Sequence, residues 1–307
     1  MFNKKKQYLF INNGYSSISN ILDKGKIKQL SNKLKKILPD EKKIFYRNFK
    51  TFTKNARFKK ITPGLKDNNI LLSKNINLDF IEKNYNFIKT LKTFFNGNFY
   101  IESKWLIKVL PQALMPNWVK EEVKDIGMPQ LNMYMKDKYR NVTYLNGLDY
   151  HQDNGGRLRN STTILIYLDP VLSDADSPIR ILDKSHILGA TQYPHYCRIS
   201  SNKKKIFYSD LNGNHICTKE KKIYGMGGTI VFFNGYTLHG STIDDEKKKT
   251  RLALRYVLSP KKKSKKSIFE KSNKKIITKS FYIKNYRLDK MKNLYNKKCG
   301  KVINYVR

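Results

Sequence analysis

Residues 227–260, GGTIVFFNGYTLHGSTIDDEKKKTRLALRYVLSP, place two apolar segments on either side of a short charged one. Apolar runs that are rich in β-branched and aromatic residues and bounded by turn residues are typical of buried β-strands. This stretch therefore predicts two strands, at 227–235 and 251–260, in a mainly β fold.

The charged segment between these strands predicts a hairpin that turns about Asp245. In such a hairpin His239 and Arg251 are equally far from the turn and lie opposite each other. Ser241 is on the same face as His239, because side chains alternate along a strand. One neighbourhood would then hold a metal ligand, a hydroxyl and a guanidinium. The alternative for Arg251 is a surface ion pair with Asp244 or Asp245.

A second pair of metal-binding groups lies upstream, in residues 148–156, LDYHQDNGG. If this segment ends a strand, His151 and Asp153 point to the same side and Gln152 points away. The glycines that follow leave room for the chain to turn. An ordinary polar turn can have the same residues, so the pair needs a third ligand before it defines a site.

His239 supplies that third ligand. Two histidines and one carboxylate form the facial triad of non-haem Fe(II) oxygenases, which leaves coordination positions open for a cosubstrate and O₂. The planar fork of an arginine pairs bidentately with a carboxylate, such as the far end of 2-oxoglutarate. The residues thus predict Fe(II) bound by His151, Asp153 and His239, and 2-oxoglutarate anchored by Arg251.

The rest of the chain supports a β fold with helices on its N-terminal side. Apolar residues at helical spacing predict helices within 24–38 and 78–95, and the apolar run at 8–11 predicts a short strand. Further strands are predicted at 98–111, 129–136, 141–145, 161–170 and 179–183. Short strands separated by turns predict a mainly β fold with flanking helices and a double-stranded β-helix core, which is a cupin-like jelly roll.

Two residues on these strands are further candidates for the cosubstrate pocket. Tyr134 shares a strand face with Lys136, and Thr163 shares one with Tyr167. Core packing or solvent exposure explains each of them equally well.

The ordered set of motifs resembles the phytanoyl-CoA dioxygenase family of Fe(II)/2-oxoglutarate oxygenases, from about residue 6 to 260. HQD at 151–153 looks like the family's HxD motif, and IRILDKSHILG at 179–189 looks like its segment that ends in Ser-His. LHGS followed by an arginine looks like its distal histidine, serine and arginine. One departure is Asp183-Lys184, where the family has Pro-Gly, and it leaves the shape of that loop open.

The resemblance implies roles for five of these residues. The Fe(II) ligands carry over to His151, Asp153 and His239. The anchor of the 2-oxoglutarate carboxylate carries over to Arg251, with Ser241 beside it.

The resemblance also implies an activity. The protein would be an oxidoreductase that hydroxylates a C–H bond of a small molecule and releases succinate and CO₂. A carboxylate at Asp153 favours hydroxylation, because the related halogenases have a small residue there. Arg157, Arg159 and Arg180 favour an anionic substrate, unless they are solvated loop residues.

The other three histidines are not expected to bind metal. We interpret His186 as structural, fixing a loop near the pocket. His195 and His215 are interpreted as solvated or loop residues.

A formal net charge of +38 raises nucleic-acid binding as a competing class of function. The lysines are spread along the whole chain, and no RRM, KH or zinc-finger pattern is present, which disfavours a nucleic-acid partner. Two alternatives stay open. The first is a non-catalytic jelly roll that binds nucleic acid or an anionic polymer. Its affinity would fall steeply with salt and would not change when metal ions are removed by a chelator. A cupin-like metal enzyme without 2-oxoglutarate predicts activity that survives the loss of Arg251.

Composition sets the remaining bounds. The hydrophobic fraction of 39% supports a packed core in this 307-residue chain. No apolar run approaches the roughly 20 residues of a membrane helix, and three cysteines without a CxxC pattern indicate neither a disulfide framework nor a zinc knuckle. We therefore expect a cytoplasmic protein without a membrane partner. We assign 1–260 to the oxygenase domain with its N-terminal helices and 261–307 to a basic linker and C-terminal extension. The sequence does not indicate an oligomeric state.

Overall fold

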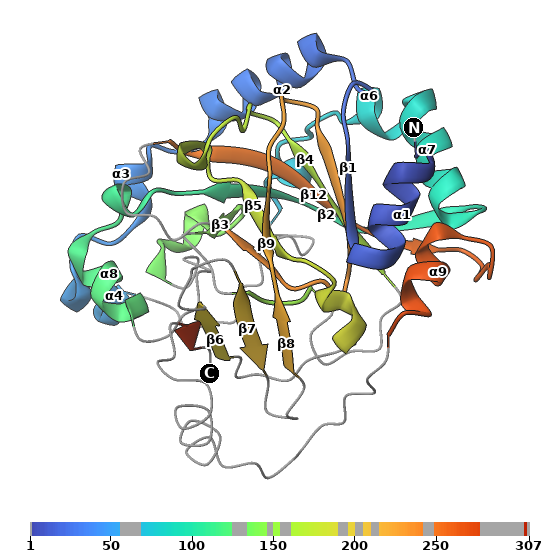
Figure 1. The fold of residues 1–307 in the computed structure, drawn as a ribbon. Coiled ribbons are helices and arrows are strands. Elements are labelled where there is room, and N and C mark those ends of the chain that lie inside the picture. Colours follow the sequence, from blue (N-terminus) through green and yellow to red (C-terminus); the bar gives the residue numbers. More distant parts are fainter. Residues whose placement is uncertain are drawn as a thin grey trace.

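The computed structural model describes residues 2–55, 69–124, 134–145, 150–153, 161–189, 196–199, 205–209, 215–241, 249–276 and 304–305. In these residues the chain forms mainly antiparallel sheets with helices packed around them (Figure 1). No helix in the described ranges is long and apolar enough to cross a membrane.

The strands of the central fold belong to two sheets. The larger sheet has the order β1-β10-β4-β12-β2-β3, and the smaller has the order β11-β5-β9. The strands of the larger sheet are β1 (Tyr15–Ile18), β2 (Phe99–Val109), β3 (Thr143–Leu145), β4 (Thr162–Tyr167), β10 (Ile230–Asn234) and β12 (Arg251–Pro260). Those of the smaller sheet are β5 (Ile179–Leu182), β9 (Glu220–Ile223) and β11 (His239–Ser241).

The chain passes back and forth between these two sheets. From β9 to β12, successive strands alternate between the smaller and the larger sheet. A buried cluster fills the space between them, with Leu165, Phe233 and Ala253 from the larger sheet and Ile179 and Ile181 from the smaller. Two mainly antiparallel sheets joined in this way form a jelly roll. The predicted jelly-roll core with flanking helices is confirmed.

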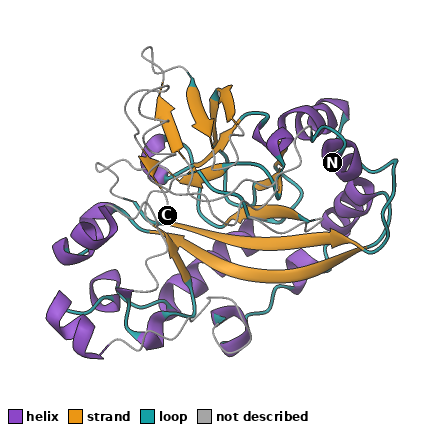
Figure 2. Ribbon diagram, turned by 90° about the horizontal axis from the view of Figure 1, so that it is seen from below, coloured by secondary structure: helices purple, strands orange, loops and turns teal. Residues whose placement is uncertain are grey.

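The opposite face of the larger sheet is covered by helices. Most of them lie on one side of the long strands, and the smaller sheets lie on the other (Figure 2). The helices are α1 (Lys4–Asn13), α2 (Lys24–Ile37), α3 (Glu41–Ile44), α4 (Phe49–Asn55), α5 (Ile70–Ser73), α6 (Asp79–Glu82), α7 (Tyr85–Phe95), α8 (Asn117–Lys124) and α9 (Ile268–Asn273). Aromatic side chains dominate this interface: the Phe94 ring lies 4.7 Å from that of Phe10 and 5.5 Å from that of Phe232.

A further sheet has the order β13-β6-β7-β8. Its strands are β6 (Tyr196–Ile199), β7 (Ile206–Ser209), β8 (His215–Thr218) and β13 (Asn304–Tyr305).

The helices predicted within 24–38 and 78–95 are present, but the strand predicted at 8–11 is wrong. These residues lie within α1, and β1 follows at Tyr15. The Asn3 side chain caps the first turn by accepting from the Lys6 amide at 2.9 Å. Gly14, with a φ of 82°, ends the helix. These caps favour a helix whose one fully buried residue is Phe10.

The predicted hairpin between His239 and Arg251 is also wrong. β11 pairs with β5, whereas β12 pairs with β2 on one side and with β4 on the other. Both edges of β12 are therefore filled, and β11 cannot pair with it. His239 and Arg251 belong to opposite sheets. Asp244 and Asp245 lie outside the described residues.

Of the strand predicted at 129–136, only the last residues are described. Met135 forms an isolated antiparallel bridge with Phe45, and Tyr134 begins a short irregular segment.

Helix α9 forms within the basic stretch that follows residue 260. Ile268 and Phe269 are buried in the same cluster as the aromatic residues of α1 and α7, and the Phe269 ring lies 5.6 Å from that of Phe95. The domain boundary at residue 260 stays a prediction.

His186 is fully buried. It belongs to a short 3₁₀ helix, Ser185–Leu188, and packs against Gly14. A Cβ atom at Gly14 would lie 2.5 Å from its Nδ1 atom, so only glycine fits at this position. Burial lowers the pKa of His186 from 6.5 to about 4. The position agrees with a structural role.

We expect His186 to make the protein less stable in mild acid. The unfolded chain takes up a proton on this residue below pH 6.5, whereas the folded chain does so only near pH 4. The folded state thus binds fewer protons in this window, and the free energy of unfolding falls by about 1.4 kcal/mol for each pH unit below 6.5.

The measurement is urea unfolding of the wild type and of His186→Leu at pH 7.5 and pH 5. Other groups contribute equally to both proteins, so the difference between the two pH slopes isolates His186. Equal slopes would contradict the prediction.

Candidate metal centre

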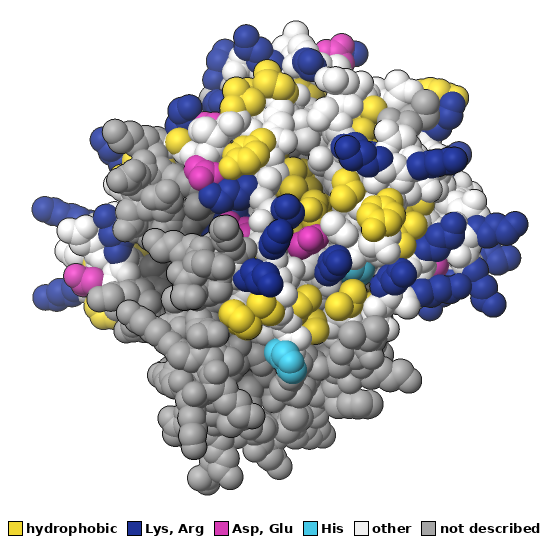
Figure 3. Space-filling model, viewed as in Figure 1, with side chains coloured by type: hydrophobic (Ala, Val, Ile, Leu, Met, Phe, Trp, Pro, Cys, Tyr) yellow, Lys and Arg dark blue, Asp and Glu magenta, His cyan; other side chains and the backbone are white. Residues whose placement is uncertain are grey.

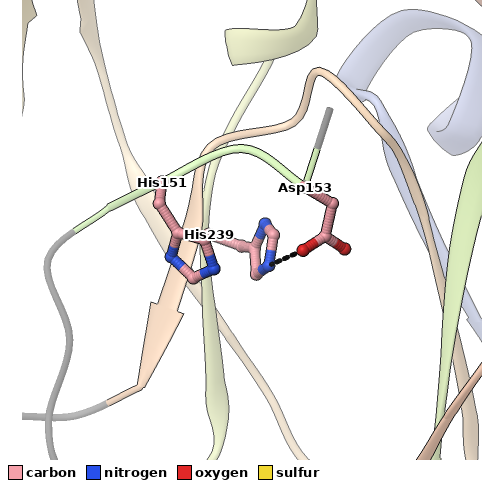
Figure 4. Close-up of side chains that lie close together, drawn as sticks. All are labelled: His151, Asp153 and His239. Atoms are coloured by element: carbon pink, nitrogen blue, oxygen red, sulfur yellow. Dashed lines mark ion pairs between the residues drawn. The ribbon is translucent and has the colours of Figure 1, made fainter. Parts of the chain in front are cut away.

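Three side chains that can bind a metal ion meet beside the outer edge of the smaller sheet. Their ligand atoms, from His151, Asp153 and His239, all lie within 4.8 Å of one another. Figure 4 shows the two imidazole rings side by side and the carboxylate directed at the His239 ring. The sequence grouped these three residues, and the structure brings them together.

The backbone fixes the spacing of the two histidines. His151 and His239 form an antiparallel bridge in which each amide donates to the other's carbonyl at 3.0 Å. The ring centroids are consequently only 4.3 Å apart. The Phe233 ring packs against that of His239, with centroids 4.4 Å apart.

Gln152 points away from its two neighbours, as predicted, although residues 150–153 form an isolated bridge and a turn instead of a strand end. Its side-chain amide donates to the carbonyls of Gly189 at 2.8 Å and Tyr236 at 2.6 Å. These two hydrogen bonds fix the segment on the side away from the site, while His151 and Asp153 face the site.

His239 is held as a neutral ring with one nitrogen free. Its Nδ1 atom lies 2.9 Å from the Thr237 carbonyl, which can only accept, so Nδ1 carries the proton. Burial lowers the pKa of His239, and the opposing effect of Asp153 does not reverse this. The Nε2 lone pair remains, 3.6 Å from Oδ1 of Asp153. Neutral imidazole with its other N–H on a carbonyl is the form that binds metals.

Asp153 is held as a carboxylate. Burial alone would raise its pKa, but Arg255, the two histidines and Thr163 together outweigh this and hold the pKa well below its usual range. The Oδ2 atom accepts from Nη2 of Arg255 at 2.8 Å and from the Thr163 hydroxyl at 2.5 Å. The Oδ1 atom is the one on the side of His239.

Arg251 lies at the start of β12 and is 3% exposed. It shares a strand face with Ala253, which lies in the cluster between the sheets. Its guanidinium lies over the Tyr167 ring, 5.2 Å from the centroid. Nε and Nη1 have no hydrogen-bond partner within the described part of the chain. Arginine stays protonated in proteins, so two buried, unsatisfied N–H groups favour an anionic acceptor at this place.

The other candidates for the cosubstrate pocket are placed differently. Thr163 faces the site, but its hydroxyl donates to Asp153. Tyr134 packs in the aromatic core, with its ring 5.7 Å from that of Phe52 and 6.1 Å from that of Trp118. The backbone of Ser241 pairs with Ile179, and its side chain lies outside the description.

The arginines considered for substrate binding give less information. Arg180 forms an ion pair with Glu220 at 3.2 Å and lies over the Tyr150 ring. Arg157 and Arg159 lie outside the described residues. His195 does so too, and His215 is exposed at the start of β8.

The sequence interpretation missed Arg255, which contacts Asp153 directly. A signal was present: in RLALR at 251–255, both arginines fall on the same face of an otherwise apolar strand. Buried arginines need anionic partners, so this pattern predicts carboxylates on the facing elements.

Comparison with known proteins gives only distant likenesses. No protein-family model matches the chain, and no curated protein matches it. HygX from Streptomyces hygroscopicus, solved with nickel and 2-oxoglutarate bound, is 12% identical, covers 85% of this chain and 88% of its own, and has a TM-score of 0.44. EctD from S. alaskensis with bound Fe is 10% identical, with coverages of 84% and 77% and a TM-score of 0.44. The non-heme alpha ketoglutarate dependent carbocyclase SnoK from nogalamycin biosynthesis is 12% identical, with coverages of 84% and 84% and a TM-score of 0.45. At this distance the likenesses do not bear on the chemistry of the site.

We expect the three-residue cluster to bind one divalent ion. His239→Ala should weaken Co(II) binding by at least about 100-fold, because even partners that only orient metal ligands change affinity by about 10- to 100-fold. Anaerobic calorimetric titration with CoCl₂ measures this.

His215→Ala is the matched control, since it removes an exposed histidine on another sheet. It should leave the affinity unchanged. Equal Co(II) affinity in the wild type and His239→Ala would rule out this cluster as the metal site.

Proposed function

We propose that the protein is an Fe(II)- and 2-oxoglutarate-dependent oxygenase of the phytanoyl-CoA dioxygenase type. It hydroxylates a C–H bond of a small molecule and releases succinate and CO₂. The observation that carries the proposal is the pairing of a His-Asp-His cluster with a buried arginine whose Nε and Nη1 atoms have no partner in the described residues.

The residues fit a ferrous ion. Two imidazole nitrogens and one carboxylate oxygen on adjoining segments match the facial triad that selects Fe(II) among protein ligand sets. An all-cysteine set would favour zinc, and an all-oxygen set would favour magnesium or calcium. When bound, Fe(II) activates O₂ at the expense of 2-oxoglutarate and supplies the oxidising power for C–H hydroxylation.

The chain's own residues have distinct tasks in this proposal. His151, Asp153 and His239 would hold the ion, and three protein ligands leave coordination positions for the cosubstrate and O₂. Arg251 would receive the distal carboxylate of 2-oxoglutarate in its buried surroundings beside the Tyr167 ring. Charge-assisted hydrogen bonds are strong in such surroundings, because water does not compete for them.

Finer features of the proposal rest on the sequence. The substrate is a small molecule, and its anionic character stays a prediction, since Arg180 is already paired with Glu220. The cytoplasmic location and the boundary between the oxygenase domain and a basic extension also stay predictions.

The face of the molecule drawn in Figure 3 does not favour a second function. Lysine and arginine side chains are scattered over the face that Figure 3 shows, without forming one stripe or groove. Nucleic-acid sites gather their cations along the path of the phosphates. We therefore do not propose binding to nucleic acid.

If Arg251 anchors 2-oxoglutarate, its substitution should weaken 2-oxoglutarate binding and leave metal binding unchanged. Arg251→Lys keeps the charge but loses the planar fork, so it should weaken 2-oxoglutarate binding by about 10- to 100-fold, the equivalent of one charged hydrogen bond. Its Co(II) affinity should be that of the wild type. Anaerobic calorimetry of the Co(II)-loaded proteins with 2-oxoglutarate measures the effect, and succinate formation with Fe(II), ascorbate and O₂ should fall in parallel.

Unchanged 2-oxoglutarate binding in Arg251→Lys would contradict the proposed anchor. A protein that binds Co(II) but no 2-oxoglutarate would favour a metal enzyme of another type.

A further inference from the structure

We propose that Arg255 is a positioning residue that determines which oxygen of Asp153 faces the metal ion. This inference rests on the proposed function, because it requires an ion among His151, Asp153 and His239. It adds a residue that neither the motif nor the ligand set contains.

The contacts of Asp153 divide its two oxygens between two tasks. Oδ2 accepts from Nη2 of Arg255 at 2.8 Å, from Nε of Arg255 at 3.3 Å and from the Thr163 hydroxyl at 2.5 Å. A carboxylate oxygen offers about two lone-pair positions, so these donors saturate Oδ2. Oδ1 is left to face His239. Asp153 can therefore give the ion one oxygen in a fixed direction.

Arg255 is itself held firmly. Its side chain is 10% exposed, and its guanidinium lies over the Trp105 ring, 4.3 Å from the centroid. Trp105 is its partner in register on β2, so the stacking is built into the sheet. Its Nη1 atom has no hydrogen-bond partner in the described residues. The guanidinium is thus clamped between an indole ring and the carboxylate it orients.

Charge and orientation make opposite predictions for this residue. A cation this close to a metal site repels the metal, so removal of Arg255 as a mere charge would tighten metal binding. As a positioning group, Arg255 prevents the carboxylate from rotating, and its removal would weaken binding. Groups that orient metal ligands typically change the affinity by about 10- to 100-fold. The sign of the change distinguishes the two roles.

The test is anaerobic calorimetric titration of the wild type, Arg255→Met and Arg255→Lys with CoCl₂. Arg255→Met should bind Co(II) about 10- to 100-fold more weakly than the wild type. Arg255→Lys keeps the positive charge but cannot donate from a rigid fork, so it should also bind more weakly. This second variant keeps the test decisive where Arg255→Met does not fold, since it leaves Asp153 facing a cation.

Arg251→Met is the matched control. It removes the same charge from the same strand face, four residues away in the sequence, and in the described residues the ion pairs of Asp153 are with Arg255 and His239. Its Co(II) affinity should equal that of the wild type or be slightly higher. Thermal unfolding of each variant shows that the comparison is made between folded proteins.

The outcomes separate the inference from the proposed function. If Arg255→Met binds Co(II) as tightly as the wild type or more tightly, or if Arg255→Lys binds like the wild type, the positioning role is overturned and the metal site stands. If the wild type binds no Co(II), the proposed function fails, and the inference fails with it.

Discussion

The arrangement of the site depends on one constraint, which is that the carboxylate of Asp153 is buried. An ionised carboxylate away from water is costly unless cations and hydrogen-bond donors face it. Here the side chain is 10% exposed, and its partners come from β4, β11 and β12. One negative charge therefore connects strands of both sheets. A metal ion would take the oxygen of Asp153 that faces His239.

The jelly roll makes this arrangement possible because its two sheets present inner faces to each other. The smaller sheet and the segment bridged to it supply His239, His151 and Asp153, while the larger sheet supplies Arg251, Arg255 and Thr163. A site divided in this way has one wall of metal ligands and one wall of cations. The apolar cluster around Phe233 and Tyr167 lies between the sheets and keeps these charges in a region of low dielectric.

Local patterns in the sequence predicted every strand of the larger sheet except β1, together with β5 and the three clustered residues. Strand-like alternation placed His151 and Asp153 on one side, and the structure agrees on that side, although the segment forms an isolated bridge and not a strand. Which strands pair with each other, in contrast, depends on residues that are far apart in the sequence. The hairpin of His239 with Arg251 failed because β2 and β4 occupy both edges of β12, which no spacing within residues 239–251 reveals. Arg255 was missed because it lies within an apolar run, and the strand pattern of that run does not show which carboxylate neutralises either of its two arginines.

Helix α1 at the N-terminus shows a second limit of prediction from local sequence patterns. Its apolar run is too short to distinguish a strand from a helix, and the decision came from Asn3 and Gly14 at its ends. These caps are visible in the sequence and carry a physical meaning, so they are a signal that can be used. The packing of α9 on α1 and α7 has no such signal, because it depends on the surface that the other helices leave uncovered.

The central claim is that one ferrous ion is held by His151, Asp153 and His239 with room beside it for a 2-oxo acid anchored on Arg251. The most direct measurement is the visible absorption of the Fe(II)-loaded protein under nitrogen, as 2-oxoglutarate is added. Chelation of Fe(II) by a 2-oxo acid produces a metal-to-ligand charge-transfer band. The account predicts this band in the wild type and its loss in His239→Ala. A wild-type protein that binds both Fe(II) and 2-oxoglutarate but develops no band would contradict it, as would a band that persists in His239→Ala.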